Sequence, residues 1–315
     1  MRKPIARAGP GFDQISGFWI GWTGFWESKK RNGGLVEMSI QIYYFSGTGN
    51  SLHVARELEK RIPGTTLIPI IGALKNKEIA TNGEMIGFIF PIYAFGLPSP
   101  VEKFLKRVDL NFTSYLFAVA TRGGSPCRVF RDIDKILRKK GKSLDASLFI
   151  DMPSNYMLLP SFEEETPESL TQYETHLQQE LNPLQDAITH EQKYFPEDLH
   201  KSFFKENALF PIITWIAQKT RYFGQEKKLY VDSECCSGCG ICEKVCLAEK
   251  IKLENGKPTW SQKVQCSFCF ACINYCPAQA IQVKRSKSPE RGRYHHSAIS
   301  PAEIAGQKID LSDEK

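Results

Sequence analysis

Nine of the ten cysteines of this 315-residue chain fall between Cys235 and Cys276. Eight of them form two copies of the spacing C-x2-C-x2-C-x3-C, one beginning at Cys236 and the other at Cys266. A disulfide scaffold would be short and would spread its cysteines along the chain. The confinement of these cysteines to one repeated segment therefore favours metal ligation in a reducing compartment.

The spacing within each copy indicates iron–sulfur clusters. It is the spacing of proteins with two [4Fe–4S] clusters, in which the fourth cysteine of each copy ligates the other cluster. We therefore assign cluster 1 to Cys236, Cys239, Cys242 and Cys276, and cluster 2 to Cys266, Cys269, Cys272 and Cys246. Structural zinc also takes four thiolates, but zinc ribbons need only two C-x2-C pairs. Iron–sulfur clusters are thus preferred to zinc.

Two features of the cysteine segment depart from a regular repeat. Pro277 follows the last cysteine of the second copy, whereas Leu247 takes this place in the first. Because proline shapes the turn and does not ligate, we expect both clusters to be kept, at a low potential of about −400 mV or below. Cys235 breaks the spacing, so we expect it to be an unligated neighbour.

The chain before the cysteines alternates between strand-like and helix-like segments. Since parallel strands need crossover connections, this alternation predicts an α/β fold with a doubly wound five-stranded parallel sheet. The expected strands are 39–45, 66–71, 85–90, 115–120 and 146–150, and the expected helices are 51–61, 98–108 and 127–140. Asn255-Gly256 predicts a hairpin between the two cysteine copies.

These segments divide the chain into five parts. We expect residues 1–37 to be an unstructured or non-native leader, because Met38 directly precedes the first clear strand. Their apolar stretch has no signal-peptide cleavage site, so we do not expect export. An α/β domain (38–155) is followed by a connector of two or three helices (156–228), with Pro167, Pro183 and Pro196 dividing its helical part. A small α+β cluster domain (229–284) and a polar tail (285–315), expected to be disordered, complete the chain.

The first strand runs into the loop Ser46-Gly47-Thr48-Gly49-Asn50-Ser51, and a helix follows. Backbone N–H groups, hydroxyls and a helix N-terminus together bind phosphate. The loop lacks both the third glycine of the dinucleotide pattern and the Gly-Lys ending of a triphosphate loop. A terminal monophosphate therefore fits it best.

A strand, this SGTGNS sequence and a helix resemble the phosphate loop of flavodoxins, which bind FMN. Two further loops lie where flavodoxins contact the flavin ring. They contribute Pro91, Tyr93, Phe95 and Gly96 after the third strand, and Thr121, Arg122, Gly123 and Gly124 after the fourth. The resemblance implies that Arg122 could stabilise a reduced, anionic flavin, and that Cys127 is a plain thiol.

The whole chain resembles the flavodoxin–ferredoxin fusion proteins found mainly in anaerobic microbes. This resemblance covers about residues 38–155 and 230–283. It implies an electron-transfer flavoprotein in which FMN and two [4Fe–4S] clusters couple one- and two-electron carriers. The alternatives are an FMN-dependent reductase of a quinone, nitro compound or oxygen, and a redox-sensing regulatory protein.

The sequence also limits the partners and the location. The net charge of +6 is scattered, and no nucleic-acid reader motif occurs. No run approaches the ~18 apolar residues that cross a bilayer. No residue qualifies as a general base or nucleophile, and His53 is expected to be a solvated helix residue. We expect a cytoplasmic protein with a redox protein as partner and no membrane or nucleic-acid contact.

Overall fold

The computed structural model describes residues 39–310, except residues 126, 159–161, 163, 199, 221, 223 and 287–291. Before residue 39 it describes only strands β1 (Lys30–Arg31) and β2 (Gly34–Leu35), which pair antiparallel. The rest of the expected leader lies outside the described residues. By its contacts the chain divides between Glu37 and Met38, and everything from Met38 onward is one unit.

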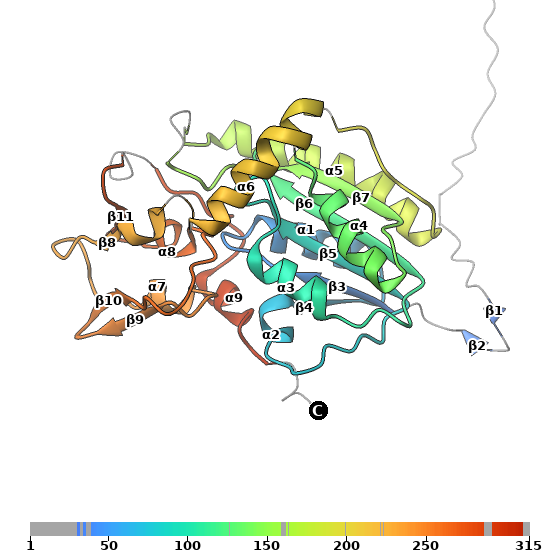
Figure 1. Cartoon of the computed structure of the whole chain (residues 1–315), viewed down its shortest axis with the longest axis horizontal. Coiled ribbons are helices and arrows are strands. Elements are labelled where there is room, and N and C mark those ends of the chain that lie inside the picture. The colour runs from blue at the N-terminus through green and yellow to red at the C-terminus, as the bar shows by residue number, and fades with distance from the viewer. Residues whose placement is uncertain are drawn as a thin grey trace, which may run out of the picture. The chain divides into compact units, whose positions relative to one another are not determined.

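A five-stranded parallel sheet forms the centre of this unit (Figure 1). Its strands are β3 (Ile40–Tyr44), β4 (Thr65–Pro69), β5 (Met85–Pro91), β6 (Tyr115–Arg122) and β7 (Ala146–Asp151). Their order in the sheet is β4-β3-β5-β6-β7, which is the flavodoxin-like order of a doubly wound fold. The predicted fold class is confirmed. In this order, ligands bind at the carboxyl ends of β3 and β5, where the winding reverses.

Helices cover both faces of the sheet. Helices α1 (Asn50–Arg61) and α5 (Pro167–Thr189) contact the strands and each other behind it, and α3 (Ser99–Arg107) contacts α2 (Ile70–Ala73) and α4 (Val129–Leu137) in front (Figure 1). A 3-10 turn, Arg138–Lys140, extends α4. The expected strand 66–71 was too long at its end, because Pro69 stops the strand and serves as the N-cap of α2. Proline has no N–H for the sheet ladder.

The expected helical connector contains α5, the π-helix η2 (Lys205–Leu209), α6 (Phe210–Lys219) and the 3-10 helix η3 (Gln225–Lys228). Our expectation that Pro183 divides helices was wrong, since Pro183 lies inside α5. The helix continues through it because a buried stripe packs on both sides of the proline. This stripe consists of Leu177, Leu181, Leu184 and Ile188.

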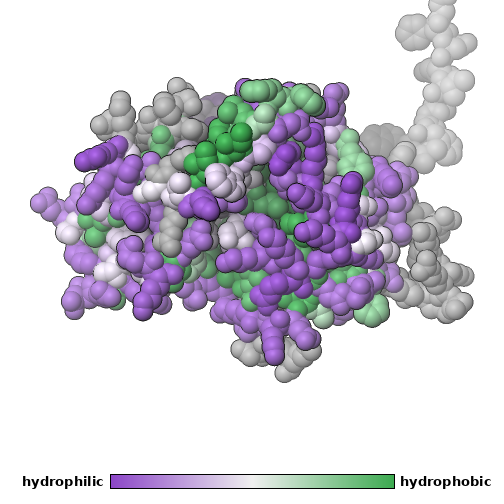
Figure 2. All heavy atoms as spheres, viewed as in Figure 1, coloured by the Kyte–Doolittle hydropathy of each residue, from purple (hydrophilic) through white to green (hydrophobic). Residues whose placement is uncertain are grey.

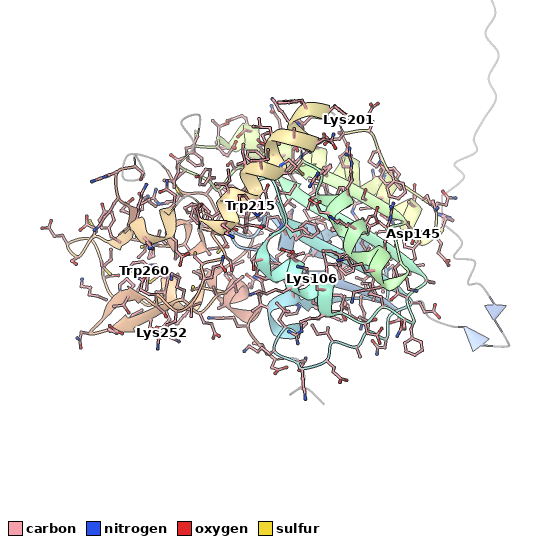
Figure 3. The ribbon with its side chains drawn as sticks, in the orientation of Figure 1. Lys106, Asp145, Lys201, Trp215, Lys252 and Trp260 are labelled. Atoms are coloured by element: carbon pink, nitrogen blue, oxygen red, sulfur yellow. The ribbon has the colours of Figure 1, made fainter. Side chains whose placement is uncertain are left out.

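Helix α6 keeps part of its apolar surface in solvent. Ile212 is 57% exposed, and Trp215, labelled in Figure 3, is 62% exposed. Figure 2 shows hydrophobic surface gathered over this helix. No helix in the described part of the chain is long and apolar enough to span a membrane.

The cysteine segment folds as two related halves. Strands β8 (Leu229–Val231) and β11 (Ile281–Val283) pair antiparallel, as do β9 (Ile251–Glu254) and β10 (Lys257–Trp260). Each half contains a short helix, α7 (Ile241–Lys244) or α8 (Ala271–Asn274). The predicted hairpin is confirmed: Asn255 and Gly256 join β9 to β10, both with positive φ.

The C-terminal segment contradicts our expectation of disorder. Residues 292–310 pack on the unit and contain α9 (Pro301–Gly306), which begins with a capping box formed by Ser300 and Glu303. Ile299 and Ile304 are buried in the same core as the sheet. The segment is polar on average, but these two apolar side chains and the cap help to hold it.

Candidate iron–sulfur centre and phosphate loop

The structure brings together the four cysteines that we assigned to cluster 1. Burial raises the pKa of the Cys242 thiol to about 11, and the nearby sulfurs of Cys276, Cys239 and Cys236 contribute to this rise. A cavity lies between these cysteines and is also lined by Gly238 and Gly240. Both glycines have positive φ, so the backbone turns tightly around this cavity.

The cysteines assigned to cluster 2 also lie together. Burial raises the pKa of Cys272, and the sulfurs of Cys266, Cys269 and Cys246 act in the same direction. Cys246 comes from the first copy and Cys276 from the second, so each set takes its fourth cysteine from the other half. Cys242, which belongs to the first set, also raises the pKa of Cys272 in the second set. The two sets therefore lie side by side.

Backbone N–H groups donate to several of the sulfurs. Lys250 donates to Cys246 Sγ at 3.3 Å, Ala280 to Cys276 Sγ at 3.2 Å, and Phe268 to Cys266 Sγ at 3.3 Å. The first two bonds occupy equivalent positions of the repeat. Hydrogen bonds to sulfur stabilise the more negative, reduced form of an iron–sulfur cluster. The two donor sets and these N–H groups therefore fit iron–sulfur clusters, and the first set also encloses a cavity.

The two irregular residues of the repeat have different surroundings. Cys235 is exposed, and its N–H group faces Asp232 Oδ1 at 3.4 Å. Leu247 is buried in the core that also contains Val245, Ile299 and Ile304. Leucine therefore provides an apolar contact with the sheet domain at the position where the second copy has proline.

The phosphate loop joins β3 to α1 at the switch point of the sheet, and Ser46, Thr48 and Ser51 are buried. Within the described residues, the N–H groups of Thr48, Asn50, Ser51 and Leu52 have no hydrogen-bond acceptor, and α1 has no side-chain cap. Buried N–H groups without an acceptor are rare in proteins. A phosphate would satisfy them, so the loop fits this group.

Two further residues lie against this loop. The buried Tyr93 hydroxyl, which has no partner among the described residues, faces Gly47. A Cβ atom added to Gly47 would lie 2.7 Å from Cys269 Cβ and 3.1 Å from its carbonyl oxygen. Glycine is therefore required here for close approach, and of the two cysteine sets, the one assigned to cluster 2 abuts the loop.

The loop after β5 does not present a free aromatic surface to a flavin. Phe95 stacks on Phe210 of α6, with ring centroids 3.9 Å apart and planes at 7°. The Thr214 side chain lies against Gly96, and its hydroxyl donates to the Ala94 carbonyl at 2.7 Å. Pro91 pairs with Thr121 in the sheet. Helix α6 thus covers the residues that we expected to stack on the flavin ring.

The loop after β6 is also committed to protein contacts. The Arg122 side chain is 5% exposed and forms ion pairs with Asp151 at 2.8 Å and Asp198 at 2.6 Å. Its hydrogen bonds hold the pKa of Asp198 below the usual range, against the opposing effect of burial. Our suggestion that Arg122 stabilises a flavin is therefore unsupported, because two carboxylates already balance its charge. Gly123 lies against Ser154, and Gly124 against His200.

Residues of the C-terminal segment complete the loop, and sequence reasoning missed them. The Gln307 side chain is fully buried: Ser46 N–H donates to its Oε1 at 2.9 Å, and its Nε2 donates to the Ser46 carbonyl at 2.8 Å. His296 N–H donates to the Thr48 carbonyl at 2.8 Å. Cys127, the remaining cysteine, is buried, which raises its thiol pKa to about 12.

The fold and the cysteine sets together define an iron–sulfur protein with a flavodoxin-like domain. A ferredoxin of Methanothermococcus thermolithotrophicus is 32% identical over 56 residues, which are 17% of this chain and 93% of that ferredoxin. A ferredoxin of Pyrobaculum islandicum is 31% identical over 67 residues, covering 20% of this chain and 60% of that protein. Through its cysteine segment, the chain belongs to the ferredoxin family.

No protein-family model matches the chain. The solved structure of rubredoxin oxygen:oxidoreductase from Desulfovibrio gigas has 13% identity and a TM-score of 0.30, and the match covers 48% of this chain and 37% of that one. The flavodoxin-like assignment therefore rests on the strand order of the chain itself. This chain is a fusion of a flavodoxin-like domain and a ferredoxin module.

Proposed function

We propose that this chain is an electron-transfer protein whose cysteines hold two [4Fe–4S] clusters and whose phosphate loop holds FMN. The observation that carries the proposal is the crossed grouping of eight cysteines beside a buried loop with unsatisfied N–H groups. When bound, such clusters supply one-electron transfer, and a flavin exchanges one or two electrons.

The two cysteine sets have different surroundings, which suggests different roles in electron transfer. Cys269 lies against Gly47, so the second set faces the phosphate loop. Cys239 in the first set is exposed, and so is its neighbour Cys235. We therefore place the docking site of a redox partner protein at the first set. The N–H groups of Lys250, Phe268 and Ala280 favour the reduced form.

The FMN part of the proposal is restricted to the phosphate. The loop offers N–H groups and the Tyr93 hydroxyl to a monophosphate, whereas Phe95, Gly96 and Arg122 are engaged with other protein groups. The flavin ring of FMN does not fit beside these residues as they are packed. FMN binding then requires Phe95 to separate from Phe210.

The same packing disfavours a reductase of a small acceptor. Such an enzyme needs access to a flavin ring, and α6 covers the loop that would hold the ring. A cavity of about 840 Å³ lies elsewhere, between α5 and residues 293–297. We therefore retain electron transfer between proteins as the proposal.

Anaerobic reconstitution with iron and sulfide tests the cluster part. We expect about eight iron and eight sulfide ions per chain and two reduction steps in a titration followed by electron paramagnetic resonance. Cys276→Ser and Cys246→Ser should each damage one cluster, while Cys127→Ser serves as the control. Zinc without sulfide, or two variants that damage the same cluster, would overturn the assignment.

Quenching of FMN fluorescence by the reconstituted protein tests the flavin part separately. Phe210→Ala removes the partner of Phe95 and should tighten FMN binding, because the stack no longer has to be broken. Gly47→Ala should weaken it, because the added Cβ collides with Cys269. Absence of quenching in both the wild type and Phe210→Ala would remove FMN from the proposal and leave the clusters.

A further inference from the structure

Three side chains from distant parts of the chain meet beside the phosphate loop. His53 is in α1, Glu174 is in α5, and His296 is in the segment before α9. One potential ligand atom of each lies within 4.8 Å of the other two. His53 is 13% exposed and its Nε2 is 2.8 Å from Glu174 Oε2, so our expectation of a solvated histidine was wrong.

Contacts among the three side chains and with neighbouring residues hold them in place. The His53 and His296 rings stack, with centroids 4.0 Å apart. Gln178 Nε2 donates to Glu174 Oε1 at 2.6 Å, which leaves Oε2 directed at His53. The backbone of His296 is fixed by its bond to Thr48. Residues that orient potential ligands in this way are typical of metal sites.

We propose that His53, Glu174 and His296 bind a divalent zinc ion. Two imidazoles and one carboxylate are a ligand set that zinc uses, with a fourth position left for water or another ligand. Calcium and magnesium prefer oxygen ligands alone, so two histidines disfavour them. The site uses none of the residues assigned to the clusters or to FMN.

The surroundings provide room for a fourth ligand. Glu174 and His296 line the cavity of about 840 Å³, together with Tyr173, Arg293 and Ser297. A water molecule or a small anion can therefore reach the ion from the cavity. The ion itself would join α1 and α5 to the C-terminal segment, and so would hold that segment against the phosphate loop.

Only one of the two ring nitrogens of His296 is available to bind the ion. Ala298 N–H donates to Nδ1 at 3.3 Å, which leaves Nε2 as the nitrogen available to the ion. Coordination through Nε2 places the remaining proton on Nδ1, where it opposes the Ala298 N–H group. Zinc binding should therefore break this long hydrogen bond and speed the amide hydrogen exchange of Ala298.

The test uses the complete chain with its clusters reconstituted, so that its cluster cysteines are occupied. The protein is equilibrated with zinc, desalted and analysed for iron and zinc, and zinc affinity is measured by competition with a chromophoric chelator. We expect about one zinc ion per chain in addition to the iron. Glu174→Gln, which preserves shape, and His53→Ala should each weaken zinc binding by more than about tenfold at unchanged iron content.

His190→Ala is the matched control, because His190 is an exposed histidine at the end of α5 and should leave zinc binding unchanged. Zinc-dependent exchange at Ala298 in the wild type, absent in Glu174→Gln, would support the proposal further. Equal zinc content in the wild type, Glu174→Gln and His53→Ala would overturn it, as would a wild-type protein that takes up no zinc.

Discussion

The Gln307 side chain is fully buried and forms hydrogen bonds with both the N–H group and the carbonyl group of Ser46. Replacing it should therefore have a large, measurable effect on the C-terminal segment. Gln307→Ala would leave the Ser46 N–H and carbonyl groups without partners. A buried polar group that loses its partner costs about 1–3 kcal/mol. We therefore expect the variant to lose roughly 2–6 kcal/mol of the free energy that holds residues 292–310 in place.

Native-state hydrogen exchange can measure this local loss without global unfolding. Since about 1.4 kcal/mol corresponds to a factor of ten, protection of the amides of α9 should fall at least about 30-fold. Ile304, whose N–H group bonds the Ser300 carbonyl, is a suitable reporter. Gln192→Ala changes an exposed glutamine elsewhere and is the control.

A second variant separates hydrogen bonding from packing. Gln307→Glu keeps an acceptor for the Ser46 N–H group but removes the donor to its carbonyl, and it buries a charge. It should therefore lower the protection of Ile304 although the side chain keeps its size. Protection within about twofold of the wild type in both variants would refute the reasoning, because 2 kcal/mol cannot produce so small a change.

The other predictions concern the cysteines and the charged groups. Cys272→Ser should lower the iron content after reconstitution, whereas Cys235→Ser should leave it unchanged, because Cys235 is exposed outside both sets; equal losses in both would contradict the ligand assignment. Arg122→Met removes the ion-pair partner of Asp198, whose side chain is 12% exposed, and should destabilise the protein by about 3–5 kcal/mol in denaturant unfolding. The difference in stability between Arg122→Met and the wild type should shrink as the pH falls below about 4. The pKa of Asp198 is lower in the folded than in the unfolded protein, so the ion pair stabilises the fold above the unfolded-state pKa. This stabilisation is lost when Asp198 becomes protonated in the folded protein. Hydrogen bonds from Ser300 lower the pKa of Glu303 to about 2, so the cap of α9 should weaken as the pH falls from about 4.5 towards 2. Glu303→Gln should abolish this pH dependence of α9 protection, and an unchanged dependence would disprove the role of the cap.

The parts of the site that depend on local spacing could be predicted from the sequence. The repeat of Cys236 and Cys266 implies the crossed sets, because each set consists of three neighbours and one cysteine from the related copy. The strands of the sheet were also predictable, since each is a short run rich in apolar, aromatic or β-branched residues. The turn at Asn255-Gly256 was predictable because both residues readily adopt the positive φ that it requires.

Contacts between distant residues could not be predicted. Arg122 pairs with Asp198 from a loop 76 positions away, so its side chain looked free for a flavin. Ser46 and Gln307 are separated by 261 positions, and the polar composition around Gln307 indicated disorder. One local signal was available and missed: Ser300 and Glu303 have the spacing of a capping box, which marks the start of α9.

The C-terminal segment contacts both halves of the proposed redox site. Tyr294 N–H donates to Asn274 Oδ1 in α8, and Tyr275 donates to the Ile299 carbonyl, while His296 bonds the phosphate loop. Helix α8 includes Cys272, so one segment is tied to the second cysteine set and to the loop at the same time. Loosening this segment, by Gln307→Ala for example, should therefore change the reduction potential of cluster 2 and phosphate binding together. A variant that changes only one of the two would show that the segment does not link them.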